Sequence, residues 1–158
     1  MAQPPATEID ASKIYRATVT TDRGVMVLDL DPALAPNTVN NFVALARQGY
    51  YDGLTFHRVV PDFVIQGGCP EGSGRGGPGY KFADEPVQGE YTLGAVAMAN
   101  SGKNTNGSQF FVCIDDCTGK LAPSYNLFGY VVEGMDVALD TGVGDVMRKV
   151  EIEERDRS

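Results

Sequence analysis

The chain has 158 residues, a length that suits one domain with a buried core of its own. Apolar residues make up 42% and charged residues 22%, as in an ordinary globular protein, and the formal net charge is -8 at pH 7. Because this acidic chain has no cluster of Lys and Arg, we do not expect it to bind nucleic acid or an anionic membrane.

The first predicted elements are a flexible arm over residues 1–12 and a hairpin at the start of a domain over 13–155. The arm holds two prolines and several small or polar residues, and it lacks the basic and apolar regions of a signal peptide. Strand-like runs at 14–21 and 25–30 flank the hairpin signal Asp22-Arg23-Gly24.

One helix is predicted next. Pro36 suits its first turn, and glycine in Gln48-Gly49 suits its C-terminal end. Between them an apolar stripe has helical spacing: Val39, Phe42, Val43 and Ala46.

The remainder reads as short strands separated by loops. The predicted strands lie at 54–60, 63–68, 93–100, 108–114, 126–132 and 146–154, with a Gly-rich loop at 69–86 and a short helix at 134–139. Seven or eight short strands with one or two helices favour a mainly β fold, a closed antiparallel β-barrel.

The cysteines and the membrane pattern narrow the class further. Cys69, Cys113 and Cys117 are an odd number without a standard metal-ligand spacing, and the chain has one histidine. This pattern favours reduced thiols over a disulfide framework or a zinc site. No apolar run approaches the ~20 residues of a membrane span. We therefore expect a cytoplasmic protein, a monomer, with no metal and no cofactor.

Two motifs in the loops indicate chemistry that their context does not support. Gly72, Gly74 and Gly77 match GxGxxG, but prolines bracket them and no helix pattern follows, so a surface loop is predicted rather than a nucleotide site. Ser73 and Ser108 lie among glycines without forming GxSxG, so a hydrolase lacks its nucleophile and base pair.

The segment TFHRVVPDFVIQGG, residues 55–68, carries the strongest candidates. Strand alternation places Phe56, Arg58 and Val60 on one face and His57 and Val59 on the other. An arginine on an apolar face needs a partner, because unpaired burial of a charge is costly. From this segment alone, an ion pair or a snorkelling side chain explains Arg58 as well as a functional role does.

Two amides shift the balance toward a binding site. Gln66 shares the apolar face beyond Pro61-Asp62, and Gln109 precedes Phe110-Phe111 in NGSQFFVCI. An arginine, two amides and several aromatic rings suit a ligand with polar and apolar ends, and they need no nucleophile. For His57 itself, a structural role as a hydrogen-bonded and partly buried side chain is favoured over a role as a general base.

These blocks resemble the cyclophilin-type peptidyl-prolyl cis-trans isomerases. The resemblance rests on FHRVVPDFVIQGG, GSGRGGPGYKFADE, AMANSGKNTNGSQFFV and LFGYVVEGMDV, in this order, and runs from about Arg16 to Glu154. It implies a closed eight-stranded antiparallel β-barrel capped by two α-helices.

The resemblance also implies a role for each matching residue. Arg58 matches the catalytic arginine, and the residues that match the substrate-binding groove are Phe63, Val64, Gln66, Ala99, Asn100, Gln109, Phe111, Leu121 and Tyr125. Val64 stands where many members have Met, Lys120 where a tryptophan often lies, and Tyr125 where a histidine often lies. These departures imply that cyclosporin-like cyclic peptides bind with reduced affinity.

The function that the resemblance implies is rotation about X-Pro peptide bonds in proline-containing peptides and in unfolded or folding proteins, without covalent chemistry. The alternative is a module that binds proline motifs and whose isomerase activity is weak or incidental. An isomerase assay on an X-Pro peptide distinguishes the two, since the module would bind without accelerating the reaction.

Overall fold

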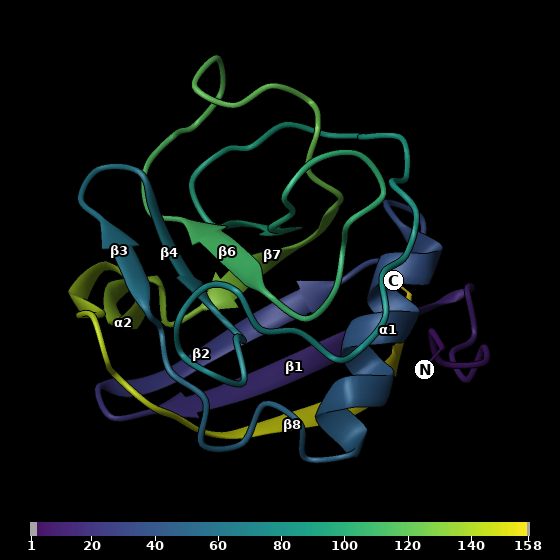
Figure 1. Ribbon diagram of the computed structural model, residues 1–158, viewed down its shortest axis with the longest axis horizontal. Helices are drawn as coiled ribbons and strands as arrows, with labels where there is room; N and C mark the ends of the chain where they lie inside the picture. Colours follow the sequence, from purple (N-terminus) through teal and green to yellow (C-terminus); the bar gives the residue numbers. More distant parts are fainter. Residues whose placement is uncertain (1–2, 158) are drawn as a thin grey trace.

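The computed structural model describes residues 3–157 and has eight strands in one antiparallel sheet with two helices. The sheet order is β3-β4-β6-β5-β7-β2-β1-β8, and the sheet curls into a half-barrel (Figure 1). The elements are β1 (Lys13–Thr21), β2 (Gly24–Leu30), α1 (Pro36–Arg47), β3 (Arg58–Val60), β4 (Val64–Gly67), β5 (Ala95–Met98), β6 (Phe110–Cys113), β7 (Leu127–Glu133), α2 (Met135–Asp140) and β8 (Met147–Asp156).

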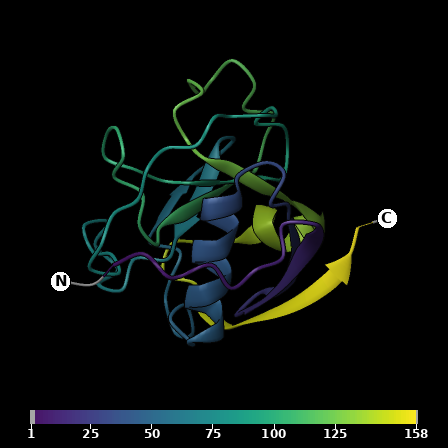
Figure 2. The same ribbon diagram turned by 90° about the vertical axis from the view of Figure 1, so that its right-hand side faces the viewer.

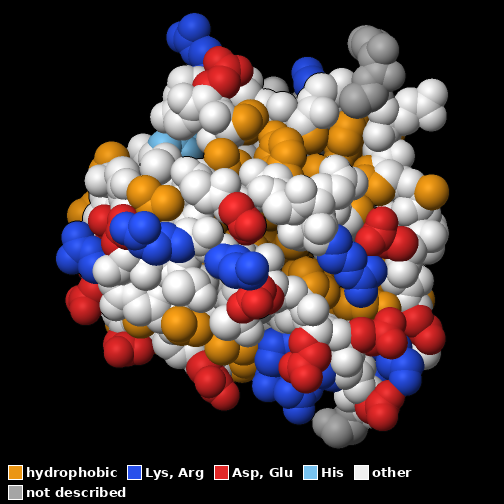
Figure 3. All heavy atoms as spheres, turned by 90° about the horizontal axis from the view of Figure 1, so that it is seen from below, with side chains coloured by type: hydrophobic (Ala, Val, Ile, Leu, Met, Phe, Trp, Pro, Cys, Tyr) orange, Lys and Arg blue, Asp and Glu red, His pale blue; other side chains and the backbone are white. Residues whose placement is uncertain are grey.

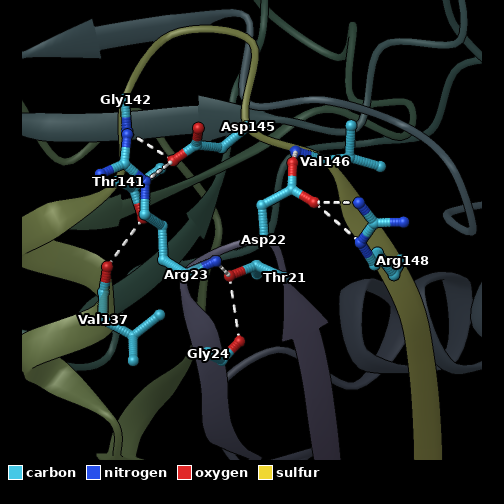
Figure 4. Close-up of polar contacts among 10 residues, drawn as sticks. All are labelled: Thr21, Asp22, Arg23, Gly24, Val137, Thr141, Gly142, Asp145, Val146 and Arg148. Atoms are coloured by element: carbon cyan, nitrogen blue, oxygen red, sulfur yellow. Dashed lines mark hydrogen bonds and ion pairs between the residues drawn. The ribbon is translucent and has the colours of Figure 1, made fainter.

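The predicted hairpin is confirmed as the β1-β2 pair, which closes at Thr21 opposite Gly24. Figure 4 shows the contacts between this turn and residues 142–148. The Asp22 carboxylate accepts bonds from the Val146 amide at 3.0 Å and from Arg148 Nε at 2.7 Å. Arg23 Nε donates to Asp145 at 2.8 Å. The hairpin is therefore tied to the segment that enters β8.

The predicted closure of the barrel is wrong, because no ladder joins β3 to β8 within residues 3–157. Instead, the segment that precedes β3 contacts the segment that leads into β8, through an isolated bridge between Thr55 and Val146. The Gly53 amide donates to the Met147 carbonyl, and the Met147 amide donates to the Leu54 carbonyl. These bonds use the backbone groups before β3, and the three-residue β3 pairs with β4 alone.

Helix α1 covers the inner face of the sheet. Its Pro36 lies in the first turn, as predicted, and Val39, Phe42 and Val43 are fully buried. No residue of the helix caps its N-terminus, and Glu85 does so from a distant loop by accepting the Asn37 and Thr38 amides at 3.0 and 2.7 Å. A carboxylate suits this position because it meets unpaired N–H groups and the positive end of the helix dipole.

The middle of the sheet is buried on both faces. Every residue of β5 and β6 is buried, because α1 covers the inner face and long loops cover the outer face. The three cysteines are buried free thiols, as predicted.

Residues 3–12 have no regular secondary structure and lie across α1 (Figure 2). Asn40 donates to the Ala6 carbonyl and accepts the Glu8 amide, and Arg47 pairs with the Glu8 side chain. The division into a flexible arm over 1–12 and a domain over 13–155 stays a prediction, and residues 1 and 2 of the arm lie outside the described residues.

The surface seen from below in Figure 1 carries acidic and basic side chains that are interspersed (Figure 3). Several pair across strands, as Arg16 of β1 does with Asp29 of β2 at 2.7 Å. Arg16 and Asp29 stay partly exposed, and pairs in contact with water contribute little to stability. No helix in the described part of the chain is both long and apolar enough to cross a bilayer.

Candidate active site

A groove with a cavity of about 430 Å³ lies on the outer face of the sheet, away from α1. Strands β3, β4 and β6 form its floor, and three loops form its walls. Its lining consists of His57, Arg58, Phe63, Val64, Gln66, Ser73, Gly74, Ala99, Asn100, Phe111, Leu121 and Tyr125.

The strand register brings the main candidates together. Arg58 of β3 lies opposite Gln66 of β4, and Gln66 lies opposite Phe111 of β6. Directly paired residues project to the same face of a sheet. One cross-strand row therefore runs from a charged group through an amide to a buried aromatic ring.

The predicted alternation of faces around Arg58 is confirmed for Val59, which lies opposite to Arg58, and is wrong for Phe56 and His57. Phe56 belongs to the inner core, whereas Arg58 is exposed in the groove and Val59 packs toward the inner core. The reason is that β3 begins only at Arg58, so strand alternation does not extend back over residues 56 and 57. His57, predicted to lie on the opposite face, lines the same groove.

A chain of hydrogen bonds orients the Arg58 guanidinium. Arg58 Nη1 donates to Gln66 Oε1 at 3.2 Å, and Gln66 Nε2 donates to Gln109 Oε1 at 3.1 Å. Gln109 Nε2 then donates to the Gly74 and Gly76 carbonyls at 2.9 and 3.0 Å. Among the described residues only Gln66 accepts from Arg58, which leaves other guanidinium donors available to a ligand.

Aliphatic and aromatic side chains line the apolar end of the groove. Val64 and Phe111 are almost fully buried at its base, and Phe63 and Leu121 pack beside them. The Tyr125 ring meets Phe111 edge to face, with centroids 5.5 Å apart. This part of the groove suits a small apolar ring, since it offers contact surface on several sides.

The polar rim of the groove is formed by Ala99 and Asn100. The Ala99 amide donates to the Gln109 carbonyl, and Asn100 Nδ2 donates to the Ser124 carbonyl at 2.8 Å. Asn100 Oδ1 accepts the Gly102 amide. The Asn100 side chain is thereby held between two loops.

Of the residues predicted for the site, Gln109 alone does not line the cavity, and it lies behind Gln66 as its hydrogen-bond partner. The roles of all these residues stay predictions. Sequence reasoning missed His57, Ser73 and Gly74 as lining residues. His57 could have been predicted to line the groove because it is next to Arg58 in the sequence. Ser73 and Gly74 reach the groove only through the fold of their loop, which the sequence does not indicate.

His57 has an unusual environment for a histidine. Its Nδ1 is buried and has no hydrogen-bond partner among residues 3–157. Burial, and then the neighbouring Arg58 cation, lower the pKa of His57. The imidazole is therefore neutral at neutral pH.

We expect this neutral histidine to make stability depend on pH. In the unfolded chain His57 titrates near ~6.5, and the folded state resists the same proton. Because the unfolded state then binds more protons, the free energy of unfolding decreases as pH falls below about 6.5. Urea unfolding at several pH values in wild type and His57→Gln measures this effect. The decrease should be smaller in the variant, and an equal decrease in both proteins would contradict the assignment.

Comparison with known proteins agrees with this fold and groove. Residues 16–156 match the family "Cyclophilin type peptidyl-prolyl cis-trans isomerase/CLD". "Peptidyl-prolyl cis-trans isomerase B" of Bacillus subtilis is 46% identical over 134 residues, covering 84% of this chain and 93% of that protein. A "Peptidyl-prolyl cis-trans isomerase" of Helicobacter pylori is 40% identical over 147 residues, covering 90% of each chain.

Solved structures show the same likeness. A cyclophilin-type peptidyl-prolyl cis-trans isomerase of Cryptosporidium parvum superposes with a TM-score of 0.81 at 29% identity, covering 89% of this chain and 98% of that chain. The same protein in the presence of the dipeptide Ala-Pro gives a TM-score of 0.80, covering 87% of this chain and 98% of that chain.

The fold, the groove and these relatives define a peptidyl-prolyl isomerase. The chain belongs to the cyclophilin-type peptidyl-prolyl cis-trans isomerase family. Relatives named as isomerases favour the enzyme over the alternative of a proline-motif binding module.

Proposed function

We propose that the groove binds the proline ring of an X-Pro segment and that Arg58 accelerates rotation about the preceding peptide bond without covalent chemistry. The observation that carries this proposal is the exposed Arg58 guanidinium, held by Gln66 beside an apolar pocket whose base is Phe111. The neighbour solved in the presence of Ala-Pro supports a ligand of this kind.

The reaction needs a catalyst of this type. Resonance opposes rotation about an amide C–N bond with a barrier of ~18–20 kcal/mol, and X-Pro bonds populate both isomers. In the twisted amide the proline nitrogen regains a lone pair, so a donor directed at that nitrogen stabilises the transition state and neither planar form. Arg58 is suited to donate that bond, because arginine stays charged and its donors lie in a fixed plane.

The other groove residues would hold the substrate while the amide rotates. Phe63, Val64, Phe111 and Leu121 would anchor the proline ring, and Asn100 at the rim would bind the backbone of the preceding residue. Gln66 would orient Arg58, and Gln109 would orient Gln66. Clients would be proline-containing peptides and folding proteins, which makes the enzyme a folding assistant.

The side chains at the rim near Lys120 affect how tightly cyclosporin-like cyclic peptides would bind. Lys120 Nζ donates to the Asp62 carbonyl at 3.1 Å and pairs with Asp115 at 3.2 Å. This part of the rim therefore presents an ammonium and its partners rather than an indole, and the chain contains no Trp. Reduced affinity for cyclosporin-like peptides follows from the lost aromatic contact.

An isomerase assay tests the proposal. Exchange between the cis and trans forms of an X-Pro peptide, followed by NMR, should be faster with the protein present. A titration of the same peptide measures binding separately. Binding without acceleration would favour the proline-motif module, and absence of both would contradict the proposal.

A further inference from the structure

Tyr91 lies outside the groove and holds one of its walls. It precedes β5 and is 5% exposed. It belongs to the same buried cluster as Phe111 and Cys117, the first residue of the loop 117–125. That loop carries Leu121 and Tyr125, which line the groove.

Both ends of the loop 117–125 are bonded to this one residue. The Tyr91 carbonyl accepts the Cys117 amide at 2.8 Å. The Tyr91 hydroxyl donates to the Tyr125 carbonyl at 2.6 Å and accepts the Tyr125 amide at 3.3 Å. Tyr91 therefore fixes the loop at both of its ends.

The polar contacts along the rim side of the loop are weaker anchors. Lys120 bonds to the Asp62 carbonyl, and Ser124 accepts from Asn100, but all of these groups lie at or near the exposed rim. Water competes for exposed bonds of this kind, whereas a buried phenol gives up its bond only at a desolvation cost. Among the described residues Tyr91 alone bonds to both ends of the loop, and the buried Cys117 adds an Sγ contact at one end.

The anchor also reaches the opposite wall of the pocket. Cys117, whose amide is held by Tyr91, directs its Sγ at the Phe63 carbonyl at 3.4 Å. The same Phe63 carbonyl also accepts the Ile114 amide at 2.9 Å, so Phe63 is held from the end of β6 as well as by Cys117. A shift of the loop would therefore move Leu121 relative to Phe63 and widen the pocket on the Leu121 side.

We propose that Tyr91 is a positioning residue that sets the affinity of the groove for proline without touching the substrate. The inference rests on the proposed function of the groove. The loop contributes ring contacts that planar and twisted amides share, while Arg58 is oriented from β3 and β4. Loosening the loop therefore weakens the ground state and the transition state equally, which raises KM and leaves kcat unchanged.

Tyr91→Phe tests this role, and Tyr130→Phe is a matched control. The control removes a hydroxyl from a partly buried tyrosine of the same cluster, which donates to the Glu90 carbonyl at 3.0 Å and, among the described residues, forms no hydrogen bond with the loop. Because Glu90 directly precedes Tyr91, this control also shows how much a loosened chain beside Tyr91 contributes. We expect Tyr91→Phe to raise the Kd of an X-Pro peptide, and its KM, about three- to tenfold, as the loss of one buried bond predicts. Turnover at saturation should stay within about twofold of wild type in both variants.

Hydrogen exchange gives a second readout. Amides of the loop 117–125 should exchange faster in Tyr91→Phe than in Tyr130→Phe. Peptide binding to wild type should slow exchange at the Cys117 amide, which Tyr91 holds and which is not part of the groove lining. If Tyr91→Phe does not fold, the wild-type exchange measurement decides the question.

Several results would overturn the inference. They are an unchanged Kd in Tyr91→Phe, an equal rise in Tyr130→Phe, a fall in kcat of the same size, or a Cys117 amide that peptide binding does not protect. Failure of the proposed function differs from these, because wild type would then bind the peptide without accelerating its isomerisation.

Discussion

Arg58→Ala is expected to lower kcat/KM for an X-Pro peptide at least about tenfold, and as much as about 10²–10³-fold if its donor acts only on the twisted amide. The guanidinium is exposed and is held by Gln66, so its removal takes away a charged donor without opening a cavity in the core. Stability to urea should therefore change little. NMR exchange of the peptide at saturating and subsaturating concentrations measures both kinetic constants.

Two further variants separate the roles of charge, geometry and neighbourhood. Arg58→Lys keeps the charge but loses the planar fork, so an intermediate rate is expected. His57 lines the same groove, and His57→Gln is expected to lower kcat/KM much less than Arg58→Ala does. Near-wild-type turnover of Arg58→Ala would refute the mechanism, and an equal loss in His57→Gln would transfer the main role to the histidine.

Gly134→Ala is expected to destabilise the fold by about 3 kcal/mol or more. Gly134 precedes α2 with φ of 80°, a conformation that costs an alanine about 1–2 kcal/mol. A Cβ there would also lie 2.1 Å from the Val25 carbonyl oxygen and 2.9 Å from the Met26 Cα, both backbone atoms of β2. The strand or the helix would have to move, and urea unfolding measures the resulting loss.

Gly144→Ala is the control for that prediction. Its φ is 90°, and apart from its two chain neighbours no atom of residues 3–157 lies within 4 Å of an added Cβ, so it carries the backbone strain without the clash. We expect a loss of about 1–2 kcal/mol there. Equal losses at both positions would mean that the close approach of Gly134 to β2 costs nothing.

Local patterns accounted for much of the fold. Pro36 and the stripe through Val39, Phe42 and Val43 predicted α1, and the turn after Thr21 predicted the first hairpin, because helix starts and tight turns depend on neighbouring residues. The prediction for α2 included Gly134, which instead precedes the helix in a left-handed conformation set by its contact with β2.

The candidate site was predicted less evenly. Motif blocks located the residues that gather around Phe111, and the groove contains nearly all of them. They did not locate Tyr91, because its importance lies in bonds to Cys117 and Tyr125, far along the chain. No pattern in the neighbourhood of Tyr91 reports such a contact.

The sequence by itself determined the family, the mainly β character and the identity of the candidate groove residues, since these depend on residue types and their order. Only the tertiary structure decided which way the residues around Arg58 face, because β3 begins at Arg58 and the chain before it pairs with Val146 instead. The same long-range pairing leaves the half-barrel open between β3 and β8. Hydrogen bonds between distant segments select one register and one face, and local periodicity cannot specify them.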